Sequence, residues 1–160
     1  MTLARWPAWL FAALAAVIVT ALLTVPGVGH AAPALLSQGH TATTSSTENA
    51  TFPASAAVDG DTGTRWSSLA ADPQWLEVDL GGTHSITQVV LNWETADAKA
   101  FQIQVSSDNA NWTNLTPVTA GVVGTQTLSV SGSGRYVRMY GTQRATQWGY
   151  SLWELEVYGS

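Results

Sequence analysis

Two aspartates flank a glycine in the segment Asp59-Gly60-Asp61, and Thr64 follows three residues later. This segment places two carboxylates and a hydroxyl around one tight turn, and calcium prefers such hard oxygen ligands together with backbone carbonyls. The spacing does not match an EF-hand loop, which requires further acidic positions before its glycine. Asp and Gly also suit ordinary turns. The pattern therefore allows either a calcium-binding turn or a plain one.

A second set of residues has the chemistry of sugar recognition, in which an aromatic ring provides a flat apolar platform and charged groups bind hydroxyls. Trp148 lies in a polar, glycine-containing segment, residues 142–150, and has no periodic apolar neighbours. We expect its side chain to be exposed, and the alternative is a loop anchor packed against the domain. Tyr150 is open to either role.

Glu48, Glu94 and Arg65 are the charged candidates for the same site. Two unpaired loop glutamates on an acidic domain suit a cationic sugar such as protonated glucosamine, and Arg65 could orient a carboxylate or a hydroxyl. The alternative for each glutamate is simple solvation at the end of a strand.

An enzyme is one competing hypothesis, because Glu94 with Asp97, or Glu48 with Glu94, could form a glycosidase pair. A small sandwich with short loops offers no deep cleft that would raise the pKa of one carboxyl group. The sequence contains no nucleophile elbow and no zinc motif. We therefore predict no enzymatic activity.

The elements that position these residues are predicted to be short β-strands separated by turns. In residues 75–80, Leu76, Val78 and Leu80 alternate with polar positions, and Gly81-Gly82 follows. Further strands are expected at residues 86–93, 101–105, 112–115, 125–130, 135–140 and 152–158, after a first edge strand before residue 49. A short helical turn is expected around residues 54–58, after Pro53. The fold class is all-β, a sandwich or barrel.

The chain of 160 residues is long enough for one domain. Arg5 precedes an apolar run at residues 8–23, and Gly29-His30-Ala31 supplies small residues, which is typical of a secretory signal. The run is shorter than the ~20 residues of a membrane span, although an uncleaved anchor is the alternative. We predict a signal peptide at residues 1–31 and a secreted, extracellular domain at 32–160.

Residues 32–160 contain five basic and eleven acidic side chains, a net charge of −6. This charge argues against nucleic acid, which requires a basic surface, and against anionic membranes. The chain contains no cysteine, so no disulfide stabilises the domain. We expect a monomer.

Several segments, in order, resemble the discoidin family, also called coagulation factor 5/8 type C, and especially its bacterial family 32 carbohydrate-binding modules. The segments are residues 57–68 (AVDGDTGTRWSS), 75–81 (WLEVDLG), 101–106 (FQIQVS), 135–138 (RYVR) and 152–159 (LWELEVYG). The resemblance covers nearly all of residues 32–160. It implies an eight-stranded jelly-roll β-sandwich of the galactose-binding-domain-like type, with its ligand site in loops at one end.

The resemblance also implies site residues. In similar domains a structural cation, calcium, is held by the residues that match Ala56, Asp59, Asp61, Thr64, Trp153 and Glu154, with Ala56 and Trp153 contributing carbonyls. The chain resembles in particular the modules attached to bacterial chitosanases and β-glucanases, and this resemblance implies binding of chitosan or a β-glucan polysaccharide. The expected contacts are Glu48, Arg65, Glu94, Trp148 and Tyr150. Such modules commonly carry an aromatic residue where this chain has Ala70. The alternative function is adhesion to proteins or cell surfaces without sugar binding.

Overall fold

The computed structural model describes residues 32–160, which contain eight β-strands and one short helix. In chain order the elements are β1 (Ala34–Leu35), β2 (Thr41–Thr44), the 3-10 helix η1 (Ala54–Ala57), β3 (Trp66–Ser67), β4 (Gln74–Trp93), β5 (Ala98–Ser106), β6 (Thr113–Asn114), β7 (Gly124–Arg144) and β8 (Ser151–Gly159). All strand pairs are antiparallel.

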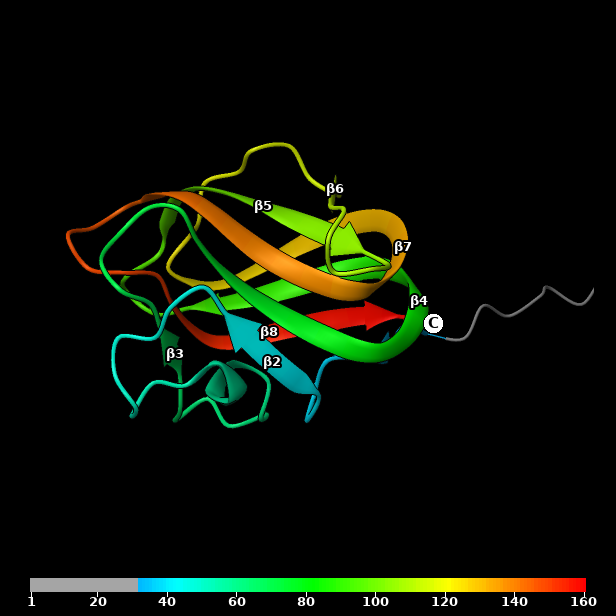
Figure 1. Ribbon diagram of the computed structural model, residues 1–160, viewed down its shortest axis with the longest axis horizontal. Coiled ribbons are helices and arrows are strands. Elements are labelled where there is room, and N and C mark those ends of the chain that lie inside the picture. The colour runs from blue at the N-terminus through cyan, green and yellow to red at the C-terminus, as the bar shows by residue number, and fades with distance from the viewer. Residues whose placement is uncertain (1–31) are drawn as a thin grey trace, which may run out of the picture. The chain divides into compact units, whose positions relative to one another are not determined.

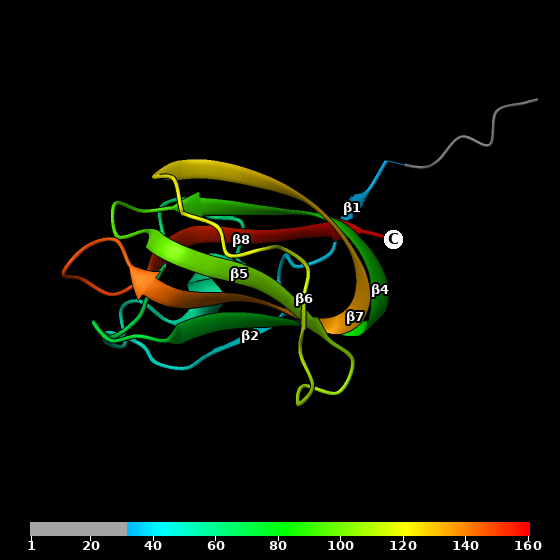
Figure 2. The same ribbon diagram turned by 90° about the horizontal axis from the view of Figure 1, so that it is seen from above.

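The strands β4 and β7 are long enough to run through both layers of the sandwich. Residues 74–79 of β4 pair with residues 136–141 of β7, and this half of the pair lies between β2 and β5. Residues 84–93 pair with residues 124–134, and this half lies beside β8. The register shifts between Asp79 and His84, where both strands bend (Figures 1 and 2). The bend brings the two halves face to face.

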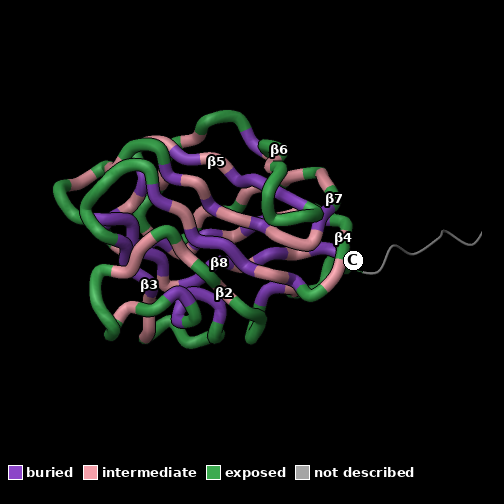
Figure 3. The backbone as a smooth tube through the Cα atoms, viewed as in Figure 1, coloured by how far each residue is buried: buried purple, intermediate pink, exposed green. Residues whose placement is uncertain are grey.

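Alternating apolar residues of the two layers meet in the core. Leu76, Val78 and Leu80 of β4 are all buried, as the alternation at residues 75–80 predicts. Trp93 at the end of β4 packs edge-on against Phe101 of β5, with ring centroids 5.4 Å apart. Buried segments therefore run along the strands while most of the connecting loops are exposed (Figure 3).

The predicted all-β jelly-roll sandwich is confirmed, as is the helical turn, which is η1. The pairs of strands expected at 75–80 and 86–93, and at 125–130 and 135–140, are each one continuous bent strand. Gly81 adopts a positive φ of 76° at the bend of β4, so glycine there permits a change of direction without ending the pairing.

The predicted signal peptide, residues 1–31, lies outside the described residues. In residues 32–160 no helix has the length and apolar character needed to cross a bilayer.

Three loops gather at the end of the sandwich opposite the C-terminus (Figure 1). They are residues 68–73 between β3 and β4, residues 94–97 between β4 and β5, and residues 145–150 between β7 and β8. These loops carry most of the predicted ligand-binding residues.

Candidate functional site

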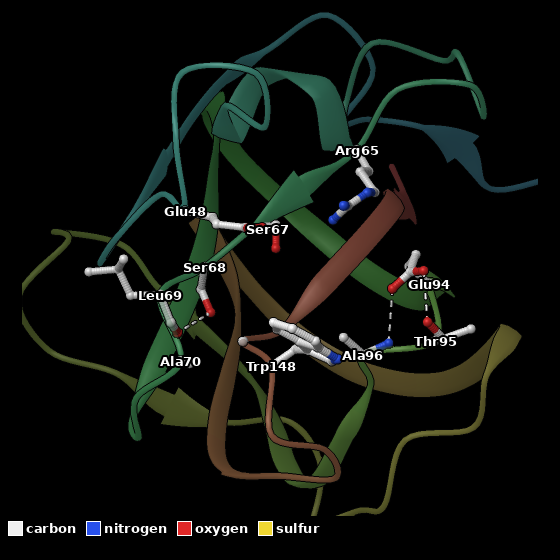
Figure 4. Close-up of a pocket in the computed structure, with 11 residues that line it drawn as sticks. Glu48, Arg65, Ser67, Ser68, Leu69, Ala70, Glu94, Thr95, Ala96 and Trp148 are labelled. Atoms are coloured by element: carbon white, nitrogen blue, oxygen red, sulfur yellow. Dashed lines mark hydrogen bonds between the residues drawn. The ribbon is translucent and has the colours of Figure 1, made fainter.

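A pocket of 480 Å³ opens at this loop end. Its volume lies within the range of about 300–1,000 Å³ that is typical of small-molecule sites. The residues that line it come from four separate parts of the chain: Glu48, Arg65, Ser67, Ser68, Leu69, Ala70, Glu94, Thr95, Ala96, Trp148 and Gly149. The side chains of Glu48, Arg65, Glu94 and Trp148 are arranged around one open space (Figure 4). Four of the five predicted ligand contacts therefore share one pocket.

Trp148 provides the apolar surface of the pocket. Its side chain is 64% exposed, the most exposed large apolar residue among residues 32–160, which excludes the alternative of a buried loop anchor. Its backbone N–H donates to Oγ1 of Thr146, 3.1 Å away. Leu69, from the loop 68–73, is 51% exposed and adds a second apolar side chain to the lining. The pocket thus has an aromatic platform that is free to meet a ligand.

Glu94 is held as a carboxylate by its own turn. Thr95 donates its hydroxyl to one carboxylate oxygen at 2.7 Å, and the backbone N–H of Ala96 donates to the other at 3.0 Å. Partial burial raises the pKa of Glu94, but these hydrogen bonds, with a smaller effect of Arg65, outweigh it and lower the pKa below its ordinary value. Glu94 is therefore an ionised acceptor at neutral pH.

Arg65 is fixed by two contacts outside the pocket lining. Its guanidinium lies 3.8 Å from the centre of the Phe52 ring and donates to Oγ of Ser151 at 2.7 Å. Ser151 in turn donates to the carbonyl of Trp66 at 3.0 Å. A cation held on an aromatic face is oriented at little further entropic cost. Arg65 can therefore present a preorganised donor to a ligand.

Glu48 completes the charged rim. Its backbone N–H donates to the carbonyl of Ser67 at 2.7 Å, while the residue as a whole is exposed. Two glutamates and one arginine give the pocket a formal charge of −1. The rim therefore favours ligands that are neutral or cationic.

The expectation that Tyr150 contacts the ligand disagrees with its position. The side chain is fully buried and does not line the pocket. Its ring fills the space that a side chain at Gly141 would occupy, since a Cβ there would lie 2.5 Å from the ring. Its hydroxyl donates to Asp72. Burial, and then the bond to the Asp72 carboxylate, hold the pKa of Tyr150 far above its usual value.

The predicted metal-binding residues lie in a separate place, between η1 and β8. The Thr64 hydroxyl donates to the Asp59 carboxylate at 2.8 Å and lies within 3.4 Å of the carbonyls of Ala56 and Asp61. The Asp61 carboxylate instead accepts the N–H of Gly63 at 2.8 Å. Four of the six predicted residues, Ala56, Asp59, Asp61 and Thr64, lie together in η1 and the turn that follows it. A fifth, Glu154 of β8, lies near Asp59. The sixth, Trp153, lies half-buried on β8, next to Glu154 in the chain.

Glu154 is the unusual residue of this group. It is 4% exposed, and Oε1 is the one buried side-chain polar atom among residues 32–160 that has no hydrogen-bond partner. Burial, and then the nearby Asp59 carboxylate, raise the pKa of Glu154 to about 7. No group of three His, Cys, Asp or Glu side chains in the described part of the chain could hold a metal ion. A cation here would therefore need carbonyl and hydroxyl oxygens as well as carboxylates.

Sequence reasoning missed several residues that shape the pocket. Ser67 and Ser68 follow Arg65 after one intervening residue, Trp66, so their closeness to Arg65 in the sequence was a usable signal. Asp72 and Arg144 contact one another across 72 residues of chain, and no local pattern marks them. Gly149 lies against the Ser68 carbonyl, where a Cβ would come within 2.1 Å. This close approach also became visible only in three dimensions.

Comparison with known proteins adds independent information. The sequence model of the F5/8 type C domain family matches residues 41–155 of this chain. The chain is 34% identical over 93 residues to the polysaccharide lyase 8 family protein HylA of Enterococcus faecalis. That stretch is 58% of this chain and 7% of the length of HylA, so the comparison concerns one small part of that protein.

Two solved structures match over nearly their whole length. One is chitosan-binding module 1 of a chitosanase/glucanase from Paenibacillus sp. IK-5, with 46% identity, a TM-score of 0.75, and coverage of 79% of this chain and 99% of that one. The other is chitosan-binding module 2 of the same enzyme, in complex with chitotriose, with 45% identity, a TM-score of 0.75, and coverage of 78% and 99%.

Proposed function

Since the chain belongs to the F5/8 type C domain family, we propose that it is a non-catalytic carbohydrate-binding module whose site is the pocket around Trp148. The observation that carries this proposal is an aromatic ring 64% exposed beside two glutamates and an arginine. A sugar ring presents apolar C–H groups on its face and hydroxyls around its edge. This lining has a counterpart for both.

The finer proposal is that the ligand is chitosan, with β-glucan as the second choice. Glu94 is ionised at neutral pH and Glu48 is exposed, so the rim can pair with a protonated amino sugar. Arg65 can bind a hydroxyl or orient a carboxylate. The identity of 45–46% with the two chitosan-binding modules supports the same choice.

The carboxyl groups near the pocket support a module without catalytic activity. A glycosidase needs one carboxyl group with a raised pKa to protonate the leaving group. Glu94 has a lowered pKa because of its hydrogen bonds. Burial raises the pKa of Asp97, but this residue does not line the pocket. No release of reducing ends is expected from any polysaccharide.

The proposal includes a structural calcium ion and an extracellular location. The Asp59 carboxylate, the Thr64 hydroxyl and the Ala56 carbonyl supply hard oxygens, and the unpartnered Oε1 of Glu154 offers one more. An ion there would connect the turn after η1 to the last strand and stabilise only the folded state. The leader-like composition of residues 1–31 supports export.

The test is calorimetric titration of residues 32–160, in calcium, with chitosan oligomers and with β-1,3-glucan oligomers. Trp148→Ala should abolish saturable binding while leaving the melting temperature unchanged, because the side chain is mostly exposed. Leu35→Ala, an exposed apolar residue on β1, is the control and should bind normally. If the folded wild-type protein gives no heat with either sugar, the proposal is wrong and protein adhesion becomes the leading alternative.

A further inference from the structure

The Trp148 platform projects from a loop that has no regular secondary structure. Residues 145–150 connect β7 to β8, and the ring of Trp148 is mostly outside the protein. An exposed aromatic side chain gains nothing from core packing, so it needs another constraint to stay in one orientation. The constraint must act on the backbone of the loop.

Arg144, the last residue of β7, donates hydrogen bonds to the backbone of this loop. Its Nη1 donates to the carbonyl of Gln147 at 3.1 Å and to the carbonyl of Trp148 at 3.3 Å. One guanidinium group therefore joins the beginning of the loop to the residue that carries the platform. The fixed fork of guanidinium donors makes arginine suited to such a role.

Asp72, from the neighbouring loop 68–73, holds Arg144 in place. One Asp72 carboxylate oxygen lies 3.3 Å from Nε of Arg144, and the other accepts the hydroxyl of buried Tyr150. The same loop carries Leu69, the other exposed large apolar residue of the lining. The bonds of Arg144, Asp72 and Tyr150 thus connect the two loops that carry the apolar surface of the pocket.

None of these three residues lines the pocket. We propose that Arg144 is a positioning residue, which preorganises the Trp148 platform for a carbohydrate ligand by fixing the backbone of residues 145–148 to Asp72. This inference rests on the proposed function of the pocket, but its structural part can be tested without a ligand.

The physical effect is on the entropy of binding. A platform that moves in the free protein must be ordered when the ligand binds, and immobilising one large side chain with its loop weakens affinity by about three- to tenfold. Arg144→Ala should therefore weaken oligosaccharide binding by about this factor without removing any ligand contact. Arg144→Lys keeps the charge but lacks the fork, so it should recover only part of the affinity.

The control is Arg135→Ala. Arg135 also pairs with an aspartate, Asp79, at 2.7 Å, but it lies at the register shift of β4 and β7, between the pairs Asp79–Tyr136 and His84–Gly134. The bend of these strands is at the end of the sandwich opposite the loops of the pocket (Figure 1). The loss of Arg135 changes the net charge equally and should leave binding unchanged. The decisive experiment combines Arg144→Ala with Trp148→Phe, which keeps a smaller platform and measurable binding. If Arg144 acts through the platform, the two losses of affinity are not additive; strictly additive losses would contradict the inference.

The ligand-free measurement is ¹⁵N relaxation of the amides of residues 145–149 and of the Trp148 indole N–H. In wild-type protein and in Arg135→Ala these groups should be as ordered as the strands, and in Arg144→Ala their order parameters should fall below about 0.6. An unchanged order parameter in Arg144→Ala would refute the inference, whatever the sugar titrations show. A wild-type protein that binds no sugar would instead refute the proposed function alone.

Discussion

Glu154→Gln is the substitution that tests the interior of this domain most directly. The Glu154 side chain is 4% exposed, its Oε1 has no hydrogen-bond partner, and Asp59 lies beside it. In a metal-free protein a buried carboxylate in this position is unfavourable, because burial and a like charge both penalise ionisation. A bound calcium ion would reverse this by supplying an opposite charge. The same substitution should therefore have opposite effects in chelator and in calcium.

The size of the metal-free effect follows from the pKa of Glu154. Burial, with Asp59, raises this pKa from 4.5 to about 7. At ~1.4 kcal/mol per pKa unit, the folded state binds this proton more tightly by about 3 kcal/mol. For a raised pKa the stabilisation is present below pH 4.5 and is lost as the pH rises through 7. In chelator the free energy of unfolding of the wild-type protein should fall by about 3 kcal/mol between pH 4.5 and pH 8.

Glutamine does not titrate, so Glu154→Gln in chelator should lack this decline and be more stable than wild type at pH 8. Calcium at one thousand times its dissociation constant stabilises the folded state by about 4.1 kcal/mol, which exceeds the metal-free penalty of about 3 kcal/mol. The wild-type protein should gain this amount, while Glu154→Gln should gain much less because it has lost a charged ligand. The order of stability of the two proteins should therefore invert when calcium replaces chelator at pH 8.

The assay is urea unfolding followed by tryptophan fluorescence, at several pH values, with chelator and with calcium. Glu77→Gln is the matched control, because Glu77 is also buried and burial raises its pKa, but it lies in the other layer of the sandwich. That variant should keep the full calcium response. Equal stability of the wild-type protein in calcium and in chelator would refute the calcium site. A wild-type protein without a pH slope in chelator would refute the account of Glu154.

Three further predictions concern the pocket and the sheet. Gly149→Ala places a Cβ 2.1 Å from the Ser68 carbonyl, so it should destabilise the domain by about 1–3 kcal/mol and weaken sugar binding at least tenfold, measured by urea unfolding and calorimetry. Ala70→Trp adds an aromatic residue to the lining, and titration with chitosan oligomers should show binding strengthened by about three- to tenfold; unchanged affinity would mean that this side of the pocket does not meet the ligand. Arg138→Met removes a cation that lies 3.8 Å from the Trp112 ring, which should lower the free energy of unfolding by about 1 kcal/mol and leave the dissociation constant for sugar unchanged.

The sequence predicted the fold well where a local periodicity of apolar residues determines the structure. The alternation of Leu76, Val78 and Leu80 identified the buried face of β4, because successive side chains of a strand point to opposite sides. It did not reveal that β4 continues through Gly81 and Gly82. Glycines terminate some strands and bend others, and the outcome here depends on β7 pairing with both halves of β4.

The sequence likewise predicted only some of the pocket residues, because it reveals local patterns but not the contacts made in the folded chain. Trp148 could be recognised as exposed because no neighbouring position in its loop is periodic and apolar. Tyr150, two residues later, is buried because Gly141 leaves a space across the sheet and Asp72 accepts its hydroxyl. Gly141 lies in the preceding strand, β7, and Asp72 lies 78 residues away in the chain. A local pattern therefore could not separate the two aromatic residues.

Two identical dipeptides show the limit of what local sequence can predict about the environment of a side chain. Trp93-Glu94 stands at the end of β4 and Trp153-Glu154 lies within the neighbouring strand β8, where Asn92 pairs with Glu154. Glu94 follows its strand and receives hydrogen bonds from its own turn, which lower its pKa. Glu154 lies inside its strand, where burial raises its pKa to about 7. The same two letters thus give an ionised group that can recognise a ligand and a buried group that needs either a proton or a cation. What distinguishes them is whether the strand ends at the glutamate, and that is determined by the pairing of the whole sheet.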